Sequence, residues 1–216
     1  GAETCRWADR AHMSGVLPRS EDGRIRSDVF LDLATPIMTK GAQYFSWIED
    51  EIRSVPPEDV TVHHNFVQTA LHPLLLRAPF VYRTFAKPLG YAGDYEMVNQ
   101  ILGDPRQGPS SYFQLVNFMF LQAGVAVAHR NRIDIMCERL DELAASAVKA
   151  GRPMRVLNVG CGPAVELQRF VRDNPHSDML EFVLVDFSEE TLEYTRQRLE
   201  EARRPTGRRL HLTLQH

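Results

Sequence analysis

The sequence predicts a mixed α/β fold in which an all-helical N-terminal domain is followed by the first part of a parallel β-sheet. Apolar residues recur at spacings of three and four through most of the first 150 residues, as on the buried face of a helix. From Met154 onward, short apolar runs alternate with helical segments in the order β-α-β-α-β. This alternation favours parallel strands joined by right-handed crossovers.

The helical region has two predicted parts. Residues 1–27 are polar with scattered charges, so we expect a flexible arm there, with at most a short helix near Trp7. Residues 28–152 are expected to form a helical cap domain, interrupted by Pro56-Pro57 and by the turn-rich segment 87–96, where Asp94 can cap the next helix. The expected helical segments are 28–52 with a bend near Pro36, 60–77 with a possible division at Pro73, 95–102, a helix starting at Ser110 or Ser111, and 122–149.

The predicted α/β domain covers residues 153–216. Its strands are expected at 155–160 and 181–187, with a third beginning at 210–214, because each run is short, apolar and rich in β-branched residues. Helices are expected at 164–173 and 189–203, the second capped by Ser188, with Leu192 and Leu199 facing inward.

Composition and charge narrow the class of protein. Of the 216 residues, 44% are hydrophobic and 25% are charged, which is typical of a globular chain. The net charge of −3 argues against a nucleic-acid partner, and no run of 18 apolar residues predicts a membrane span. Cys5, Cys137 and Cys161 are too far apart in sequence to suggest a zinc site, so we expect reduced thiols in a cytoplasmic protein and no metal.

The first predicted strand leads into a glycine turn. Gly160 and Gly162 allow a tight turn and the close approach of a ligand, and the following helix presents N–H groups there. The second strand ends at Asp186, a position from which a carboxylate can accept hydrogen bonds from ribose hydroxyls. The carboxyl ends of these two strands therefore predict a nucleoside site.

The turn departs from the dinucleotide pattern GxGxxG, because Val165 stands at the third glycine position and Pro163 removes one N–H donor. It resembles instead motif I of class I S-adenosylmethionine-dependent methyltransferases. That resemblance implies a Rossmann-like fold in which Gly160, Cys161, Gly162 and Pro163 contact the methionine part of the cofactor. It also implies that Asp186 binds the ribose and Phe187 the adenine, while Asn158 stands where many members have an acid.

Three further segments are similar to a narrower group, the bacterial methyltransferases of the extracellular-factor type, which are proposed to make 3-hydroxy fatty acid methyl esters. These segments are KPLGYAGDYEM at 87–97, AHRNRI at 128–133 and RVLNVGCGPA at 155–164. The resemblance spans about residues 80–190. It implies S-adenosylmethionine-dependent methyl transfer to a small molecule, such as the carboxylate of a hydroxy fatty acid, beneath a helical cap.

Two groups of side chains could complete this site. Tyr91, Asp94 and Tyr95 lie on a glycine-flanked loop, where they could contact the cofactor or serve only as packing residues and a helix cap. Arg130 and Arg132 could bind the cofactor's carboxylate or an acidic substrate, or form a solvated helix face. His129 is a candidate substrate contact, whereas the doublet His63-His64 is expected to be structural because its members point to different faces of a helix.

The expected sheet has three strands, whereas the resemblance implies a class I core of seven. We therefore expect an incomplete core, low activity of this stretch alone, and pairing of an open sheet edge with a second copy. No catalytic residue follows from the sequence. Alternatives are a nicotinamide-dependent oxidoreductase, a non-catalytic interaction module with a vestigial methyltransferase fold, and a nucleic-acid methyltransferase, against which the net charge argues.

Overall fold

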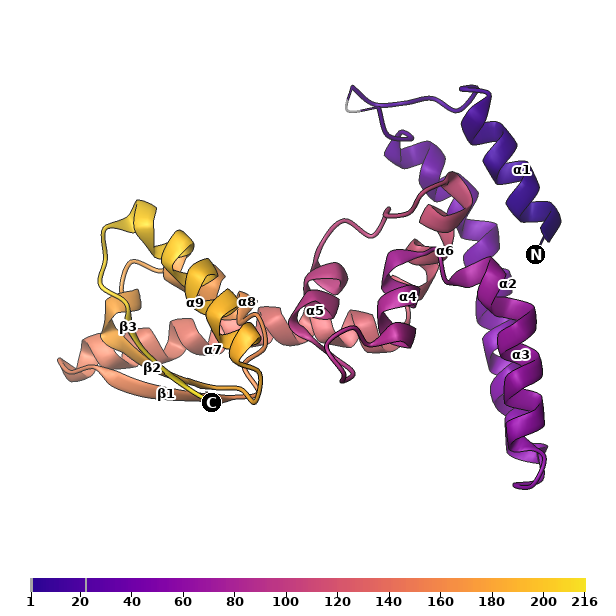
Figure 1. Ribbon diagram of the computed structural model, residues 1–216. Helices are drawn as coiled ribbons and strands as arrows, with labels where there is room; N and C mark the ends of the chain where they lie inside the picture. Colours follow the sequence, from indigo (N-terminus) through magenta and orange to yellow (C-terminus); the bar gives the residue numbers. More distant parts are fainter. Residues whose placement is uncertain (1, 22) are drawn as a thin grey trace. The chain divides into compact units, whose positions relative to one another are not determined.

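The computed structural model describes residues 2–21 and 23–216, and the side chain of Cys5 lies outside the described part. Helices and strands follow in the order α1 (Ala2–Met13), α2 (Ser27–Ser54), α3 (Val60–Leu75), α4 (Pro79–Ala86), α5 (Tyr95–Leu102), α6 (Ser111–Leu121), α7 (Gly124–Ala150), β1 (Met154–Val159), α8 (Val165–Asp173), β2 (Leu180–Val185), α9 (Glu189–Arg203) and β3 (His211–Gln215) (Figure 1). Short 3-10 turns precede β2 and follow α9. The predicted mixed α/β class and the β-α-β-α-β order are confirmed.

The chain divides into two compact units, and the division differs from the boundary expected at residue 152. The helical unit comprises residues up to Pro88 together with Gly103–Ala126. The α/β unit comprises Leu89–Leu102 and Val127–His216. The segment carrying Tyr91, Asp94 and Tyr95 therefore belongs to the unit with the sheet, because its side chains pack on α9.

The helical unit has a core of its own. Phe30 and Ala34 of α2 are buried with Leu115 of α6, and the Phe30 ring meets the Phe118 ring edge-on at a centroid distance of 5.4 Å. Asn117, 1% exposed, accepts a hydrogen bond from the Phe80 backbone N–H at 2.8 Å. Its amide group also donates to the carbonyl of Pro105, so one buried side chain ties α4 and a loop to α6.

Two prolines of this unit lie within helices. Helix α2 continues through Pro36, and α3 includes Pro73 close to its C-terminal end. Residues 2–13 form the regular helix α1, where the sequence predicts a flexible arm with at most a short helix. The break at Pro56-Pro57 is confirmed, since α2 ends at Ser54 and α3 begins at Val60.

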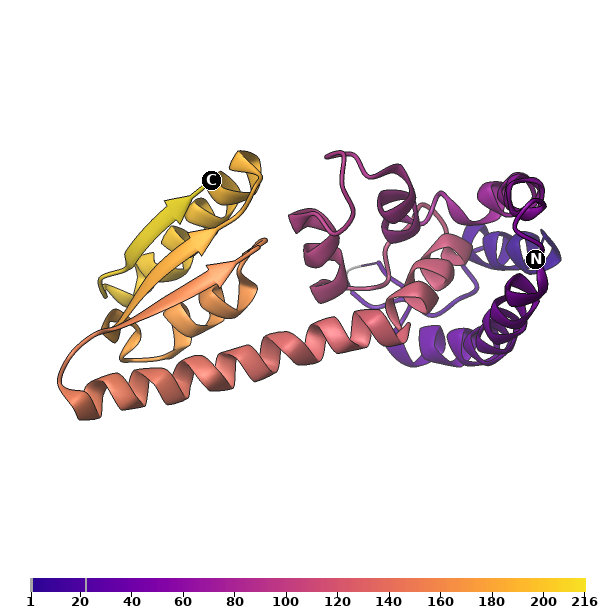
Figure 2. The same ribbon diagram turned by 90° about the horizontal axis from the view of Figure 1, so that it is seen from below.

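The α/β unit is built on a three-stranded parallel sheet in the order β1-β2-β3. Met154 pairs with Leu180 and Val159 with Val185, so β1 and β2 end at the same level. Glu181 pairs with His211 across the other ladder. Figure 2 shows the three strands side by side. This register brings the residues that follow β1 and β2 together at the carboxyl ends of the strands.

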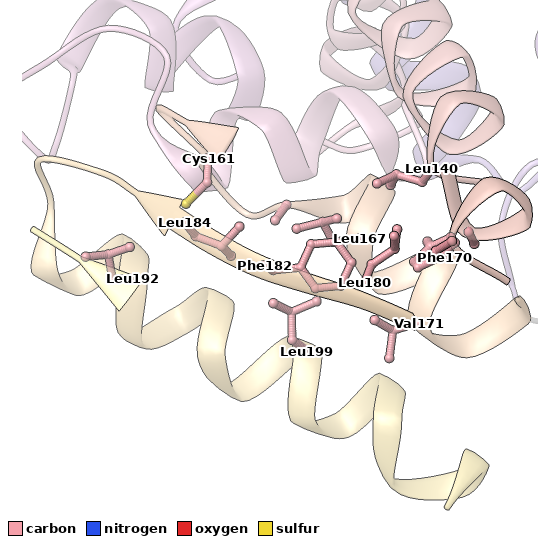
Figure 3. Close-up of a cluster of buried hydrophobic side chains, with 13 residues drawn as sticks. Leu140, Cys161, Leu167, Phe170, Val171, Leu180, Phe182, Leu184, Leu192 and Leu199 are labelled. Carbon is pink, nitrogen blue, oxygen red and sulfur yellow. The ribbon is translucent and has the colours of Figure 1, made fainter. Parts of the chain in front are cut away.

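One face of the sheet carries the hydrophobic core of this unit. Alternate residues of β2 point into it and are almost fully buried, and α8 and α9 supply Leu167, Phe170 and Leu199 (Figure 3). Leu140 of α7 joins the same cluster. On the opposite face, Leu157 is 63% exposed and Val159 is 71% exposed.

The helices were also tested for membrane-spanning character. Among the described residues, no single helix has the length and hydropathy needed to cross a membrane. Helices α6 and α7 meet the criterion only when they are taken together as a broken pair.

Candidate functional site

The glycine turn between β1 and α8 adopts a conformation that few other residues reach. Gly160 has a φ of 66° and Gly162 a φ of 52°, both in the left-handed region that favours glycine. A Cβ atom added at either position would meet nothing within 4 Å. These glycines are therefore not required by crowding within the chain, and the turn has open space beside it that a ligand could use.

The N–H groups of this turn are used within the chain. Gly160 and Cys161 both donate to the carbonyl of Val185, at 2.8 and 3.2 Å. Gly162 donates to a carboxylate oxygen of Asp186 at 3.1 Å, and Pro163 has no N–H. A phosphate held by a glycine-rich turn requires free backbone N–H donors. Gly160, Cys161 and Gly162 do not provide them, because their N–H groups are already bound within the chain.

Asp186 follows β2 and connects the two strand ends. It is 7% exposed, and its second carboxylate oxygen accepts a hydrogen bond from the Ser188 N–H at 3.0 Å. Since each carboxylate oxygen can accept two hydrogen bonds, one position on each oxygen remains for a further donor. Asp186 thus shapes the turn and retains the capacity to bind hydroxyl groups.

A second buried carboxylate follows the turn, at the start of α8. Glu166, in the first turn of α8, is 4% exposed and accepts a hydrogen bond from the Asn158 amide at 3.0 Å. Burial raises the pKa of Glu166 above its ordinary range, while the Asn158 hydrogen bond and the charge of Arg132 oppose that rise. Sequence analysis did not single out Glu166, although an acid in the first turn of a helix behind a glycine turn was a usable signal.

The pKa of the Cys161 thiol reflects the charges around the turn. Burial first, and then the negative charges of Asp186 and Glu166, raise the pKa of its thiol to about 12. Both carboxylates therefore act on the same point of the glycine turn. Negative charge at this point favours a cationic group beside the turn.

The segment 89–95 packs beside Asp186. The ring of Tyr91 meets the ring of Phe187 edge-on at a centroid distance of 4.6 Å. The Tyr91 hydroxyl lies 3.2 Å from the hydroxyl of Thr191, which is 1% exposed. Phe187 remains 67% exposed, so an apolar ring surface is available next to the carboxylate.

The next residues of this segment are structural. Asp94, 2% exposed, accepts a hydrogen bond from the Met97 N–H at 2.8 Å, which confirms the predicted cap of α5. The Tyr95 ring stacks on Tyr194, and its hydroxyl donates to Glu190 at 3.0 Å. These contacts hold α5 against α9 and account for Asp94 and Tyr95 without a ligand.

The two arginines of α7 have different surroundings. Arg130 donates to the carbonyl of Ile101 at 3.3 Å and so helps to hold the end of α5. Arg132 is exposed, lies 3.0 Å from a ring nitrogen of His129, and exerts its charge on Glu166. Burial, and then the Arg132 charge, lower the pKa of His129. Arg132 is therefore the arginine associated with the glycine turn.

Two other candidate residues belong to the helical unit. His63 and His64 are on α3 of the helical unit, and His64 lies 3.1 Å from the amide nitrogen of Gln68. Within residues 2–21 and 23–216, no group of three or more His, Cys, Asp or Glu side chains is arranged to hold a metal ion.

Comparison with known proteins adds no assignment. No family model, curated protein or solved structure matches the chain.

Proposed function

We propose that the chain binds S-adenosylmethionine at the glycine turn and that its sheet belongs to a Rossmann-like, class I methyltransferase fold. The observation that carries this proposal is the pair of buried carboxylates, Asp186 and Glu166, which both act on Cys161 in a turn whose N–H groups are used internally. This arrangement favours a nucleoside ligand with a positive charge and no phosphate. An adenosyl sulfonium has both properties.

The residues around the turn fit the parts of that ligand. Asp186 retains hydrogen-bonding positions for ribose hydroxyls, and the exposed ring of Phe187 offers a surface for adenine. The open space beside Gly160 and Gly162 would take the sulfonium end. Tyr91 fixes the orientation of the Phe187 ring through their edge-on contact.

S-adenosylmethionine supplies an activated methyl group, which passes to a nucleophile by in-line displacement at the carbon bound to sulfur. The chain then has to bind, orient and exclude water rather than activate the methyl group. A carboxylate acceptor needs no general base because it is already ionised. This agrees with a site in which Cys161 is a protonated thiol and no nucleophile is activated.

The acceptor that we propose is a small acid with an apolar tail. Its support is the resemblance of the segments 87–97, 128–133 and 155–164 to methyltransferases of the extracellular-factor type. Labelled cofactor and a panel of 3-hydroxy fatty acids, small amines and RNA would test this. Methyl label found only in RNA or protein would contradict it.

A nicotinamide-dependent oxidoreductase is the alternative that the turn disfavours, because a dinucleotide places a pyrophosphate where these N–H groups are used. Isothermal titration of the chain with S-adenosylmethionine and with NAD would decide between them. We expect binding of the first ligand only. In Asp186→Asn, the affinity should fall about ten- to hundredfold, equivalent to about 1.5–3 kcal/mol. The exposed Asp178→Asn is the matched control, and preferential binding of NAD would overturn the proposal.

A further inference from the structure

Helix α3 combines exposure with an absence of charge. The structure describes all of its residues, Val60–Leu75, and none of them is buried. None of them is Asp, Glu, Lys or Arg either, whereas the solvent side of a surface helix normally carries charged residues. Exposed apolar surface of this kind marks a contact with another molecule.

The outer side of α3 carries an apolar ridge. Phe66 is 73% exposed and Val62 is 69% exposed, and they lie one helical turn apart. Thr69 and Pro73 continue the same line at spacings of three and four residues, and both are exposed. Leu75 packs against the core of the helical unit from the opposite side of α3, so the ridge points away from that core.

A groove of matching character lies in the same unit. It has a volume of about 610 Å³ and runs along α2 at the point where α6 ends. The other wall of the groove includes Met119 and Phe120, and flexible methionine side chains adapt to a group that enters beside them. The wall formed by α2 is a single line of residues at helical spacing, namely Met38, Ala42, Phe45 and Glu49.

The ridge and the groove complement each other. A helix that binds in an apolar groove inserts side chains spaced three and four residues apart, which is the spacing along the ridge. Glu49 contributes a negative charge to the groove, and α3 brings no carboxylate that would oppose it. The centre of a stable protein interface is likewise poor in charged residues and rich in aromatic residues and methionine.

We propose that the chain forms a two-fold dimer in which the α3 ridge of each copy lies in the groove between α2 and α6 of the other, with Phe66 as the central anchor. The ridge and the groove belong to one compact unit, so each copy supplies both and the contact forms twice across the axis. Aromatic anchors that enter a pocket contribute most of the binding energy of an interface. This dimer differs from pairing at an open sheet edge, and it does not depend on a ligand at the glycine turn.

Sedimentation velocity measures the association directly. We expect the wild-type chain to form dimers at micromolar concentrations. Phe66→Ser removes the anchor and Ala42→Arg fills the groove, so each variant should weaken the association about tenfold or more. Both positions are exposed, so both variants should keep the circular dichroism spectrum of the wild type. Trp47→Ser is the matched control and should change nothing, because Trp47 is 58% exposed and lies on the side of α2 opposite to Phe45.

A mixture of the two variants tests the pairing of ridge with groove. Phe66→Ser keeps an intact groove and Ala42→Arg keeps an intact ridge, so one of the two contacts can still form between them. We expect the equimolar mixture to associate more strongly than either variant alone and more weakly than the wild type. Equal association of the mixture and the separate variants would overturn the pairing.

Hydrogen exchange on the wild-type chain needs no substitution. Residues 60–67 are all exposed, so their exchange should slow as the concentration of the chain rises. Exchange in α1 should stay unchanged over the same range. A wild-type chain that remains monomeric, or a dimer that Phe66→Ser leaves intact, would overturn the proposal, and the second result would point to pairing at the sheet edge instead.

Discussion

Replacing Asp186 by asparagine is expected to weaken the fold of the α/β unit as well as ligand binding. One carboxylate oxygen accepts the Gly162 N–H at 3.1 Å and the other accepts the Ser188 N–H at 3.0 Å. Asparagine has one acceptor, and its NH₂ group must face the second backbone N–H. The substitution therefore leaves a partly buried backbone donor opposed by another donor.

The size of this effect follows from the two hydrogen bonds. Hydrogen bonds to a charged acceptor contribute about 1.5–3 kcal/mol each, and loss of one of them in a partly buried position should lower the free energy of unfolding by about 2 kcal/mol. For a domain of about the size of the α/β unit, a loss of 1 kcal/mol in the free energy of unfolding corresponds to about 4–8 °C in Tm. We expect Asp186→Asn to unfold about 8–16 °C below the wild-type chain.

Thermal unfolding followed by far-ultraviolet circular dichroism, without added ligand, measures this difference. Asp178→Asn is the control, because Asp178 is exposed and carries the same change of group. A wild-type Tm in Asp186→Asn would refute the view that the carboxylate organises the glycine turn. It would also mean that any loss of ligand affinity in this variant arises from direct contact alone.

Three other predictions concern neighbouring residues. Because the pKa of Glu166 is raised in the folded state, the folded protein binds the proton of this carboxyl more tightly than the unfolded chain does. The stability that this proton contributes is lost as pH rises from about 4 through the raised pKa. Glu166→Gln should remove this loss, so in urea titrations the variant should be at least as stable as wild type at pH 7. With a pKa of about 12, Cys161 should be alkylated on the order of a thousandfold more slowly than an ordinary cysteine at pH 8, and rapid labelling of this residue by mass spectrometry would contradict the assigned burial. Tyr95→Phe keeps the stacking on Tyr194 but loses one exposed hydrogen bond, so hydrogen exchange in α5 should rise only slightly, whereas full loss of protection would show that the hydroxyl is essential.

The sequence predicts the α/β unit more accurately than it predicts the site within it. The bounds of α9 are as expected, and Ser188 caps that helix by accepting a hydrogen bond from the Thr191 N–H. Strong local signals explain this success, since a capping residue and a run of apolar residues act over a few positions. The assignment of residues 89–102 to the sheet-containing unit could not be predicted, because it depends on contacts between residues about 95 positions apart.

The site shows the same limit. The pattern of Gly160, Gly162 and Asp186 indicates where a ligand could bind, and the register of β1 and β2 places these residues together. It does not reveal that the N–H groups of the turn are already used, because their acceptors lie on the following strand. Nor does it reveal the contact between Asn158 and Glu166, which joins the end of β1 to α8.

The most direct test of the central claim is a competition experiment by native mass spectrometry. The chain is incubated with equal concentrations of S-adenosylmethionine and NAD, and the mass of the bound species is measured. We expect one molecule of S-adenosylmethionine per chain, because two buried carboxylates act on a turn that has no free N–H groups at Gly160, Cys161 or Gly162. Preferential binding of NAD, or binding of neither ligand, would contradict this prediction.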